Sequence, residues 1–193
     1  MKKPELIRKI SILLGGVLIS GALILLVCWQ ISIGVYADRA ANNASLIQQM
    51  LGEPEPAVLE ERKNSEMPAF SIEGVDFVGL LTFASRDAVI PIRSTWDHRL
   101  LYMSCYSGSV YDGSIVIGAT TQKGQCDFYR DINVSETLYF TDMTGKRYAY
   151  TVSDIRIRRH VDPAVLQGEE ELILFIKNLY ASEYTVLFCD AQN

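Results

Sequence analysis

The sequence has little of the chemistry that metal sites and nucleic-acid sites need. Its 193 residues include two histidines, His98 and His160, and four cysteines with no C-x-x-C spacing. Since zinc sites are built from closely spaced Cys and His ligands, we expect no metal centre, and no cofactor is indicated. The net charge of −5 gives no reason to expect a nucleic-acid partner. There is no internal repeat or low-complexity tract, so the length allows one modest domain with additions.

The longest uncharged run extends from Ile10 to Ala37 and is rich in Leu, Ile, Val and Gly. A helix of about 20 apolar residues crosses a bilayer core of about 30 Å, so this run predicts a transmembrane helix. The apolar part of a cleaved signal peptide is shorter, roughly 7–15 residues, which favours an uncleaved anchor. Four basic residues precede the run and place the N-terminus in the cytoplasm: Lys2, Lys3, Arg8 and Lys9. We therefore expect a single-pass plasma-membrane protein whose C-terminal domain lies outside the cell.

Helical character continues from Ala37 to Leu51 and ends where Gly52-Glu53-Pro54-Glu55-Pro56 interrupts it. The stretch from there to Pro68 is charged and poor in large apolar residues, as in a linker. The chain is thus expected to have four parts: a basic cytoplasmic tail (1–9), a transmembrane helix (10–37), a juxtamembrane helix with a linker (38–69) and a compact domain (70–193).

The compact domain has a pattern of short strands separated by turns. Ser114–Ala119 is a continuous apolar run, typical of a buried strand, and Asp142–Lys146 predicts a hairpin turn with Gly145 in the left-handed conformation. Seven or eight strands with little helix in about 120 residues predict an all-β barrel or sandwich. The other expected elements are strands at Phe77–Phe83, Ala88–Ile92, Thr137–Thr141, Arg147–Arg156, Glu171–Lys177 and Tyr184–Cys189, and one helical turn at Val161–Leu166.

Four segments of this domain carry a joint signal: Leu80–Ile92, Cys105–Ala119, Phe128–Asp142 and Leu172–Cys189. In their order and nearly ungapped spacing they resemble the sortases, which are cell-surface cysteine transpeptidases, and class B and D sortases in particular. The opening segment retains one of the two prolines that the family pattern has, as Pro91, and has Ala84 in place of the other. The resemblance covers nearly all of residues 70–193 and implies a sortase-like eight-stranded β-barrel with short helices.

The resemblance also implies a catalytic Cys, His and Arg, and this sequence departs from the family at all three positions. The nucleophile strand, L-T-L-x-T-C in sortases, reads L-I-L-F-I-K here, which places Lys177 at the Cys position. The His position falls on Thr120 and the Arg position on Tyr184. A lysine amine with its ordinary pKa of about 10.4 is mostly protonated and is a poor nucleophile. A threonine hydroxyl does not titrate near neutral pH, and a phenol donates a single hydrogen bond.

Two cysteines provide alternative nucleophiles, Cys189 and Cys126. Cys189 also ends a strand-like run, but the block from Lys177 to Cys189 fits the spacing between the nucleophile and the last strand without a gap, which favours Lys177. Cys189 also reads as a small core residue. A Cys105–Cys189 disulfide is compatible with an extracellular domain, although the sequence does not determine the pairing.

Two polar segments are interpreted as surface features. Trp96-Asp97-His98-Arg99 reads as a surface turn far from the catalytic positions, and Arg158, Arg159 and His160 read as a basic strip.

The expected function is therefore that of a membrane-anchored, catalytically inactive pseudo-sortase on a Gram-positive-type cell surface. Its partner would be a sorting-signal peptide, a pilin or a true sortase. The alternative is an active cysteine transpeptidase or peptidase with a rearranged site that uses Cys189 or Cys126, in which case one thiol should have a lowered pKa. A third possibility is a structural remnant with a filled groove.

Overall fold

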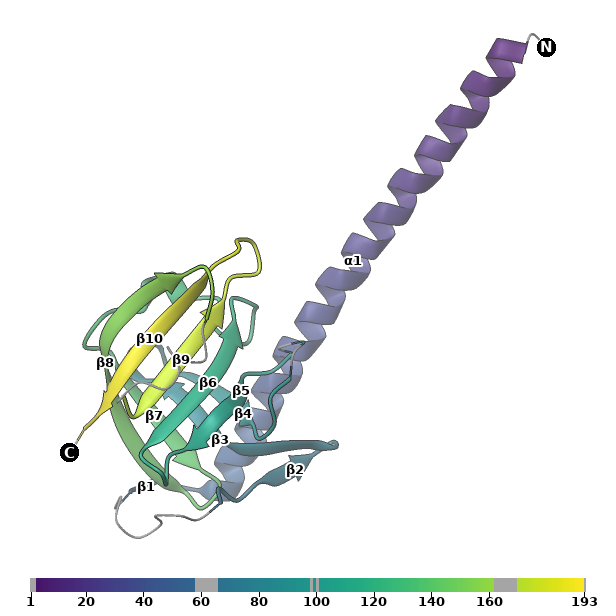
Figure 1. Ribbon diagram of the computed structural model, residues 1–193. Coiled ribbons are helices and arrows are strands. Elements are labelled where there is room, and N and C mark those ends of the chain that lie inside the picture. The colour runs from purple at the N-terminus through teal and green to yellow at the C-terminus, as the bar shows by residue number, and fades with distance from the viewer. Residues whose placement is uncertain (1–2, 58–65, 98, 100, 162–169, 193) are drawn as a thin grey trace. The chain divides into compact units, whose positions relative to one another are not determined.

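The computed structural model describes residues 3–57, 66–97, 99, 101–161 and 170–192. Within these residues, eight strands form a closed β-barrel (Figure 1), in agreement with the predicted fold. The barrel strands are β3 (Val75–Phe83), β4 (Ala88–Arg93), β5 (Ser104–Ser109), β6 (Ser114–Thr120), β7 (Thr137–Asp142), β8 (Lys146–Arg158), β9 (Leu172–Lys177) and β10 (Tyr184–Ala191). Two shorter strands are attached to it, β1 (Glu55–Pro56) to β8 and β2 (Phe70–Ile72) to β3.

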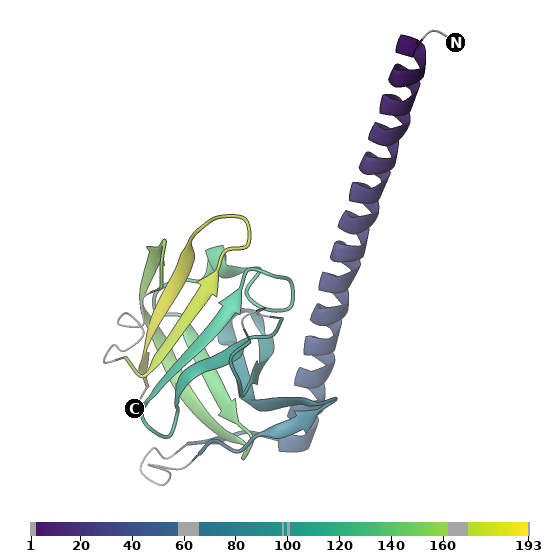
Figure 2. The same ribbon diagram turned by 45° about the vertical axis from the view of Figure 1, so that its right-hand side comes forward.

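The barrel closes because β3 pairs with both β4 and β7, and β7 pairs with β8. The resulting circuit is β3-β4-β5-β6-β9-β10-β8-β7. β9 and β10, the last two strands of the sequence, lie between β6 and β8. Both views show β6, β9 and β10 side by side (Figures 1 and 2). The β6–β9 pair is parallel, whereas β10 is antiparallel to both of its neighbours. This topology brings the end of β6 beside the adjoining ends of β9 and β10, which follow it by more than 50 residues.

Side chains of β9 alternate between the barrel interior and its outer face, as in any strand. Leu172, Leu174 and Ile176 belong to the interior cluster, whereas Ile173 and Phe175 belong to a separate cluster on the outer face. Full burial of one such side chain stabilises the fold by about 1.5–3 kcal/mol, which holds the strand in this register. The same alternation places Lys177, two residues after Phe175, on the outer face.

The helix α1 (Lys3–Leu51) extends through two compact units, Met1–Val35 and Tyr36–Asn193. In the first unit, large apolar side chains are exposed along the helix, among them Leu18 and Leu25. Between Ser11 and Leu51 the helix is long and apolar enough to cross a membrane, in agreement with the apolar run seen in the sequence.

In the second unit, the last turns of α1 pack against the outside of the barrel. Ala40, Ala44 and Ile47 are buried against a cluster that includes Phe77, Leu80 and Tyr102. Gly124, in the segment after β6, has a φ of +82°, and a Cβ built on it would lie 2.7 Å from the Cα of Ala37. The backbone of the helix at Ala37 therefore packs directly against the backbone at Gly124, with no side chain between them.

Two short 3-10 helices, η2 (Ala84–Arg86) and η3 (Tyr129–Asp131), follow β3 and precede β7. The predicted turn before β8 is confirmed, with Gly145 at a φ of +82°. Neither β1, which lies in the expected linker, nor the packing of the helix against the barrel was expected from the sequence. The predicted helical turn at Val161–Leu166 falls, after its first residue, outside the described residues.

Candidate functional site

The three positions that replace the sortase catalytic residues lie in one row across β6, β9 and β10. Thr120 is the register partner of Lys177 in the parallel β6–β9 pair. Lys177 is in turn the partner of Tyr184 in the antiparallel β9–β10 pair. The structure thus brings Thr120 beside Lys177 and Tyr184, which lie more than 50 positions further along the sequence. It places Lys177 exposed in the middle, Thr120 buried on one side and Tyr184 half-buried on the other.

Thr120 is held by the segment that follows it. Its backbone N–H donates to Oε1 of Gln125 at 2.9 Å, and its carbonyl oxygen accepts from the N–H of Cys126 at 3.1 Å. The hydroxyl oxygen accepts from the N–H of Gln122 at 3.3 Å. The side chain thus has a structural use in capping this turn. It offers no group that could move a proton near neutral pH.

Lys177 begins the connection between β9 and β10, and the following residues fix the shape of that connection. The buried Asn178 side chain donates to the hydroxyl of Tyr129 at 3.1 Å and to Oε1 of Glu183 at 3.2 Å. In contrast, Lys177 forms no ion pair with a described residue, and its side chain extends into solvent. Leu179 and Tyr180, at the tip of the connection, are 40% and 81% exposed.

An aromatic cluster lies on the outer face beside this row. The rings of Trp96, Tyr106 and Phe175 contact one another, with centroids 5.0 Å apart for Trp96–Tyr106 and 5.5 Å apart for the two other pairs. The ring of Tyr184 lies 6.4 Å from that of Phe175. The cluster thus reaches the Lys177 row and gives it an apolar wall.

The placement of Trp96 corrects one sequence-based interpretation. The Trp96–Arg99 segment was expected to be a surface turn far from the catalytic positions, and the structure places Trp96 on the outer face of β6 and β9, within the cluster. Asp97 is 8% exposed and forms an ion pair with Arg93 at 3.0 Å, which anchors the segment. His98 lies outside the described residues. A tryptophan beside two charged residues reads as a turn, because only the folded barrel provides the surface that it covers.

Comparison with solved structures gives a consistent result for the fold. Similar structures include a sortase D5 transpeptidase from Clostridium perfringens (TM-score 0.57, 13% identity, 80% of this chain and 98% of that chain covered). Sortase A from Corynebacterium diphtheriae gives a TM-score of 0.53 at 16% identity, with 83% and 84% covered. The barrel has the sortase fold. A third structure, Clostridium perfringens sortase C with the C-terminal cell wall sorting motif, gives a TM-score of 0.53 at 13% identity, with 86% and 96% covered.

Identity this low shows the fold alone. No protein-family model matches the sequence, and no curated protein matches it at a significant level.

The cysteines of the sortase-fold domain are all buried. Cys126 and Cys189 have no exposed surface, and Cys105 is 8% exposed. Burial raises the pKa of all three thiols, that of Cys105 to about 11. The three are free thiols, so the Cys105–Cys189 disulfide that the sequence left open is not formed. Since a reactive cysteine needs an accessible thiolate, these environments are those of inert core residues.

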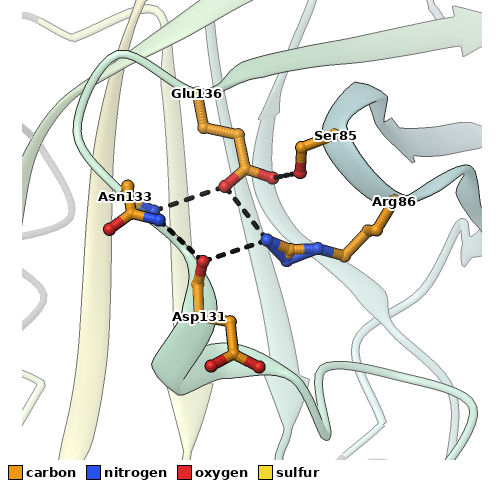
Figure 3. Close-up of polar contacts among 5 residues, drawn as sticks. All are labelled: Ser85, Arg86, Asp131, Asn133 and Glu136. Carbon is orange, nitrogen blue, oxygen red and sulfur yellow. Dashed lines mark hydrogen bonds and ion pairs between the residues drawn. The ribbon is translucent and has the colours of Figure 1, made fainter.

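A second polar cluster joins η2 to the start of β7 (Figure 3). Oε1 of the buried Glu136 accepts from the hydroxyl of Ser85 at 2.5 Å. Its Oε2 pairs with Nη2 of Arg86 at 3.3 Å and accepts from the N–H of Asn133 at 3.3 Å. The carbonyl oxygen of Asp131 also accepts from Arg86 Nη2, at 3.0 Å, whereas its carboxylate points away from the cluster (Figure 3).

The sequence indicated only a turn at Ser85-Arg86-Asp87, because the partner of Arg86 lies 50 residues further on. Buried polar groups that are hydrogen-bonded to one another in this way fix local structure, and we assign the cluster to stability. Among the described residues, no three His, Cys, Asp or Glu side chains are grouped so that they could hold a metal ion.

Proposed function

We propose that this chain is a membrane-anchored, extracytoplasmic sortase-fold protein that does not catalyse transpeptidation and that works by binding. The observation that carries the proposal is the row of Thr120, Lys177 and Tyr184 at the strand ends of the sortase-fold barrel. At that row the domain presents a hydroxyl, an amine and a phenol.

Acyl transfer by the sortase route requires a nucleophile that can later leave, a proton carrier and a donor for the developing oxyanion. If the amine of Lys177 attacked a peptide carbonyl, the product would be an ordinary amide, and the cycle would stop there. Thr120 can carry no proton at neutral pH. Loss of a single member of such a set in a serine protease lowers kcat by up to about 10⁶-fold, so the combined loss leaves no useful rate.

The ligand that we favour is a sorting-signal peptide, with a pilin or a partner sortase as the protein that carries or receives it. The outer face supports this choice. Tyr106 and Tyr184 offer aromatic surface around Phe175, and Lys177 adds an exposed cation at its end. Extended peptides bind to such faces through apolar side chains and a few polar contacts.

The membrane location rests on the apolar helix. Between Ser11 and Leu51 it is long enough to span, and the basic residues before it favour a cytoplasmic N-terminus. The barrel would then lie outside the cell, on the side where a sortase partner or a pilin would also be present.

The alternative, an active enzyme that uses Cys189 or Cys126, requires the barrel to open. Cys189 is paired with Leu172 on one neighbouring strand and with Val152 on the other, and its thiol is in the interior. No described contact lowers the pKa of either thiol enough to offset burial, because desolvation is the largest influence on both.

The test uses the full chain in detergent micelles, mixed with sorting-signal peptides and an amine acceptor. Mass spectrometry follows cleavage and transfer, with Cys189→Ala as control, and calorimetry follows binding of the same peptides. We expect no cleavage, and binding that Lys177→Glu weakens. Cleavage that disappears in Cys189→Ala would overturn the proposal in favour of an enzyme. Absence of both cleavage and binding would favour a structural remnant.

A further inference from the structure

Gly118, in the middle of the outer face of β6, is covered by the indole ring of Trp96. A Cβ built on Gly118 would lie 2.2 Å from Cζ3 and 2.7 Å from Cη2 of Trp96, and 2.6 Å from Cζ of Phe175. These distances are far below normal contact, so the ring is seated on bare backbone, where only glycine fits. The position above Gly118, bounded by Phe175 and Tyr106, is thus shaped for one large flat side chain.

The side chain in this position comes from a loop, whereas its neighbours come from strands. Tyr106, Phe175 and Tyr184 belong to β5, β9 and β10. Trp96 belongs to the connection between β4 and β5, which is anchored through the ion pairs of Asp97 with Arg93 and Arg99. A change in this connection would therefore remove Trp96 and leave the three strand-borne rings in place.

Two cations border the same face. Lys177 follows Phe175 by two residues on the same side of β9, which places the two side chains about 7 Å apart along the strand. Arg158 on β8 is the register partner of Tyr184 and is exposed. Consider an extended segment that lies along β9 with an apolar side chain above Gly118. Its side chain two residues further on would lie beside Lys177, on the side of the face that Arg158 borders two strands away. A carboxylate there would complement their charge.

We infer that Trp96 is a built-in occupant of the position above Gly118, and that a partner segment displaces it. The partner's chemistry is an aromatic or large aliphatic side chain followed, two residues later, by Asp or Glu. This inference rests on the proposed binding function and names the ligand pattern and the internal competitor of that site. Binding then includes the removal of Trp96, and the apparent affinity is lowered by the fraction of molecules in which the position is filled.

The first experiment tests the position without any peptide. Trp96→Gly is made in the full chain in micelles, and 5-fluoroindole is titrated with fluorine NMR as readout. We expect saturable binding to Trp96→Gly and none to the unmodified protein. The double variant Trp96→Gly, Gly118→Ala should bind 5-fluoroindole at least about tenfold more weakly than Trp96→Gly does, because the added Cβ fills the space. A tenfold change in Kd corresponds to about 1.4 kcal/mol. Equal binding to both variants, or none to either, would overturn the inference.

The second experiment tests displacement in a Trp29→Phe background, where Trp96 is the only tryptophan. The probe is acetyl-Phe-Gly-Glu-amide, with acetyl-Phe-Gly-Lys-amide as the matched control. Binding should shift Trp96 emission to longer wavelength and increase its quenching by acrylamide. The affinity should be at least about tenfold tighter for Trp96→Gly if the indole fills the position in about 90% of molecules.

An unchanged Trp96 spectrum at saturation, or weaker binding to Trp96→Gly, would show that Trp96 is a fixed wall and would overturn the inference. If Trp96→Gly does not fold, Gly118→Ala alone tests the same position. Its added Cβ should expel the indole and shift the Trp96 emission to longer wavelength without ligand. Failure of the proposed function is a separate result: 5-fluoroindole would bind to Trp96→Gly while sorting-signal peptides bind to neither form.

Discussion

Lys177 and Tyr184 are register partners at the end of the β9–β10 pair where the loop joins the two strands, and Lys177 is the exposed member. Lys177→Cys should therefore create an accessible thiol on a protein whose other barrel thiols are buried. In a Cys28→Ser background, which removes the exposed thiol of the helix, we expect stoichiometric labelling by Ellman's reagent within minutes at pH 8. This is at least about tenfold faster than any barrel thiol of Lys177→Ser in the same background, since reaction follows access and thiolate fraction. Comparable rates in the two variants would show that the strand end is not exposed.

The same variant should remain inactive towards sorting-signal peptides. A thiol alone has no proton carrier beside it, because Thr120 occupies the neighbouring position. Adding Thr120→His and Tyr184→Arg should bring detectable cleavage if the row has the sortase geometry, whereas Lys177→Cys alone should show none by mass spectrometry. Cleavage by the single variant would mean that some other group carries the proton.

The buried thiols should make stability fall at high pH. Burial raises the pKa of Cys105 from an ordinary value of 9.0 to about 11, so the folded state holds this proton to higher pH than the unfolded chain does. The contribution is complete below pH 9 and is lost as the pH rises towards 11, by about 1.4 kcal/mol per pH unit and thiol. Urea unfolding at pH 8 to 11 should show this loss, and Cys105→Ala should reduce it. A slope unchanged by Cys105→Ala would contradict the assignment.

The Glu136 cluster allows a matched pair of variants. Glu136→Ala leaves Arg86 and Ser85 without their shared carboxylate and should lower the free energy of unfolding by about 2–3 kcal/mol. Asp131→Ala removes a carboxylate of the same cluster that points away from it, and should change stability by less than about 0.5 kcal/mol (Figure 3). Equal losses of unfolding free energy in the two variants would mean that the contacts of the Glu136 carboxylate do not stabilise the fold.

Gly124 and Gly113 form a second matched pair. Both have a left-handed φ, +82° and +79°, but a Cβ on Gly124 would meet Ala37 of α1, whereas one on Gly113 would meet no atom within 4 Å. Gly113→Ala should cost about 1 kcal/mol for its backbone conformation alone. Gly124→Ala should cost more and should also increase hydrogen exchange at Ala40 and Ala44, because the helix has to move away. The same exchange in both variants would indicate that the helix is held elsewhere.

The all-β class could be predicted from the sequence because its strand and turn signals are local, and the eight-stranded barrel was expected from the sortase resemblance. Ser114–Ala119 is a continuous apolar run, which indicates a buried strand. Gly145 marks the turn between β7 and β8, because its left-handed conformation is one that other residues adopt only at a cost. The positions Thr120, Lys177 and Tyr184 could be identified because the sortase resemblance places the His, Cys and Arg positions at these strand ends. What remained was to show that the three strands are neighbours, which only the pairing does.

The helix packing and the place of Trp96 could not be predicted in the same way. Ala40, Ala44 and Ile47 have the spacing of one helix face, but small residues give only a weak apolar signal. They also directly follow the apolar run that predicts the transmembrane helix, so they do not stand out as a separate packing surface. Trp96 is amphipathic and has charged neighbours, so its local sequence indicates a surface position. Its packing depends on Gly118, 22 positions away, and on the absence of a side chain there.

The insertion of β9 and β10 between β6 and β8 also determines when the domain can fold. Until residues 172–191 have left the ribosome, two earlier strands each keep an unpaired edge, and such edges readily join other chains. Pairings between distant segments are also slow to form. The nascent barrel thus has an open seam until β9 and β10 have been synthesised. A chain cut before β9 would therefore give an aggregation-prone sheet and no smaller stable domain.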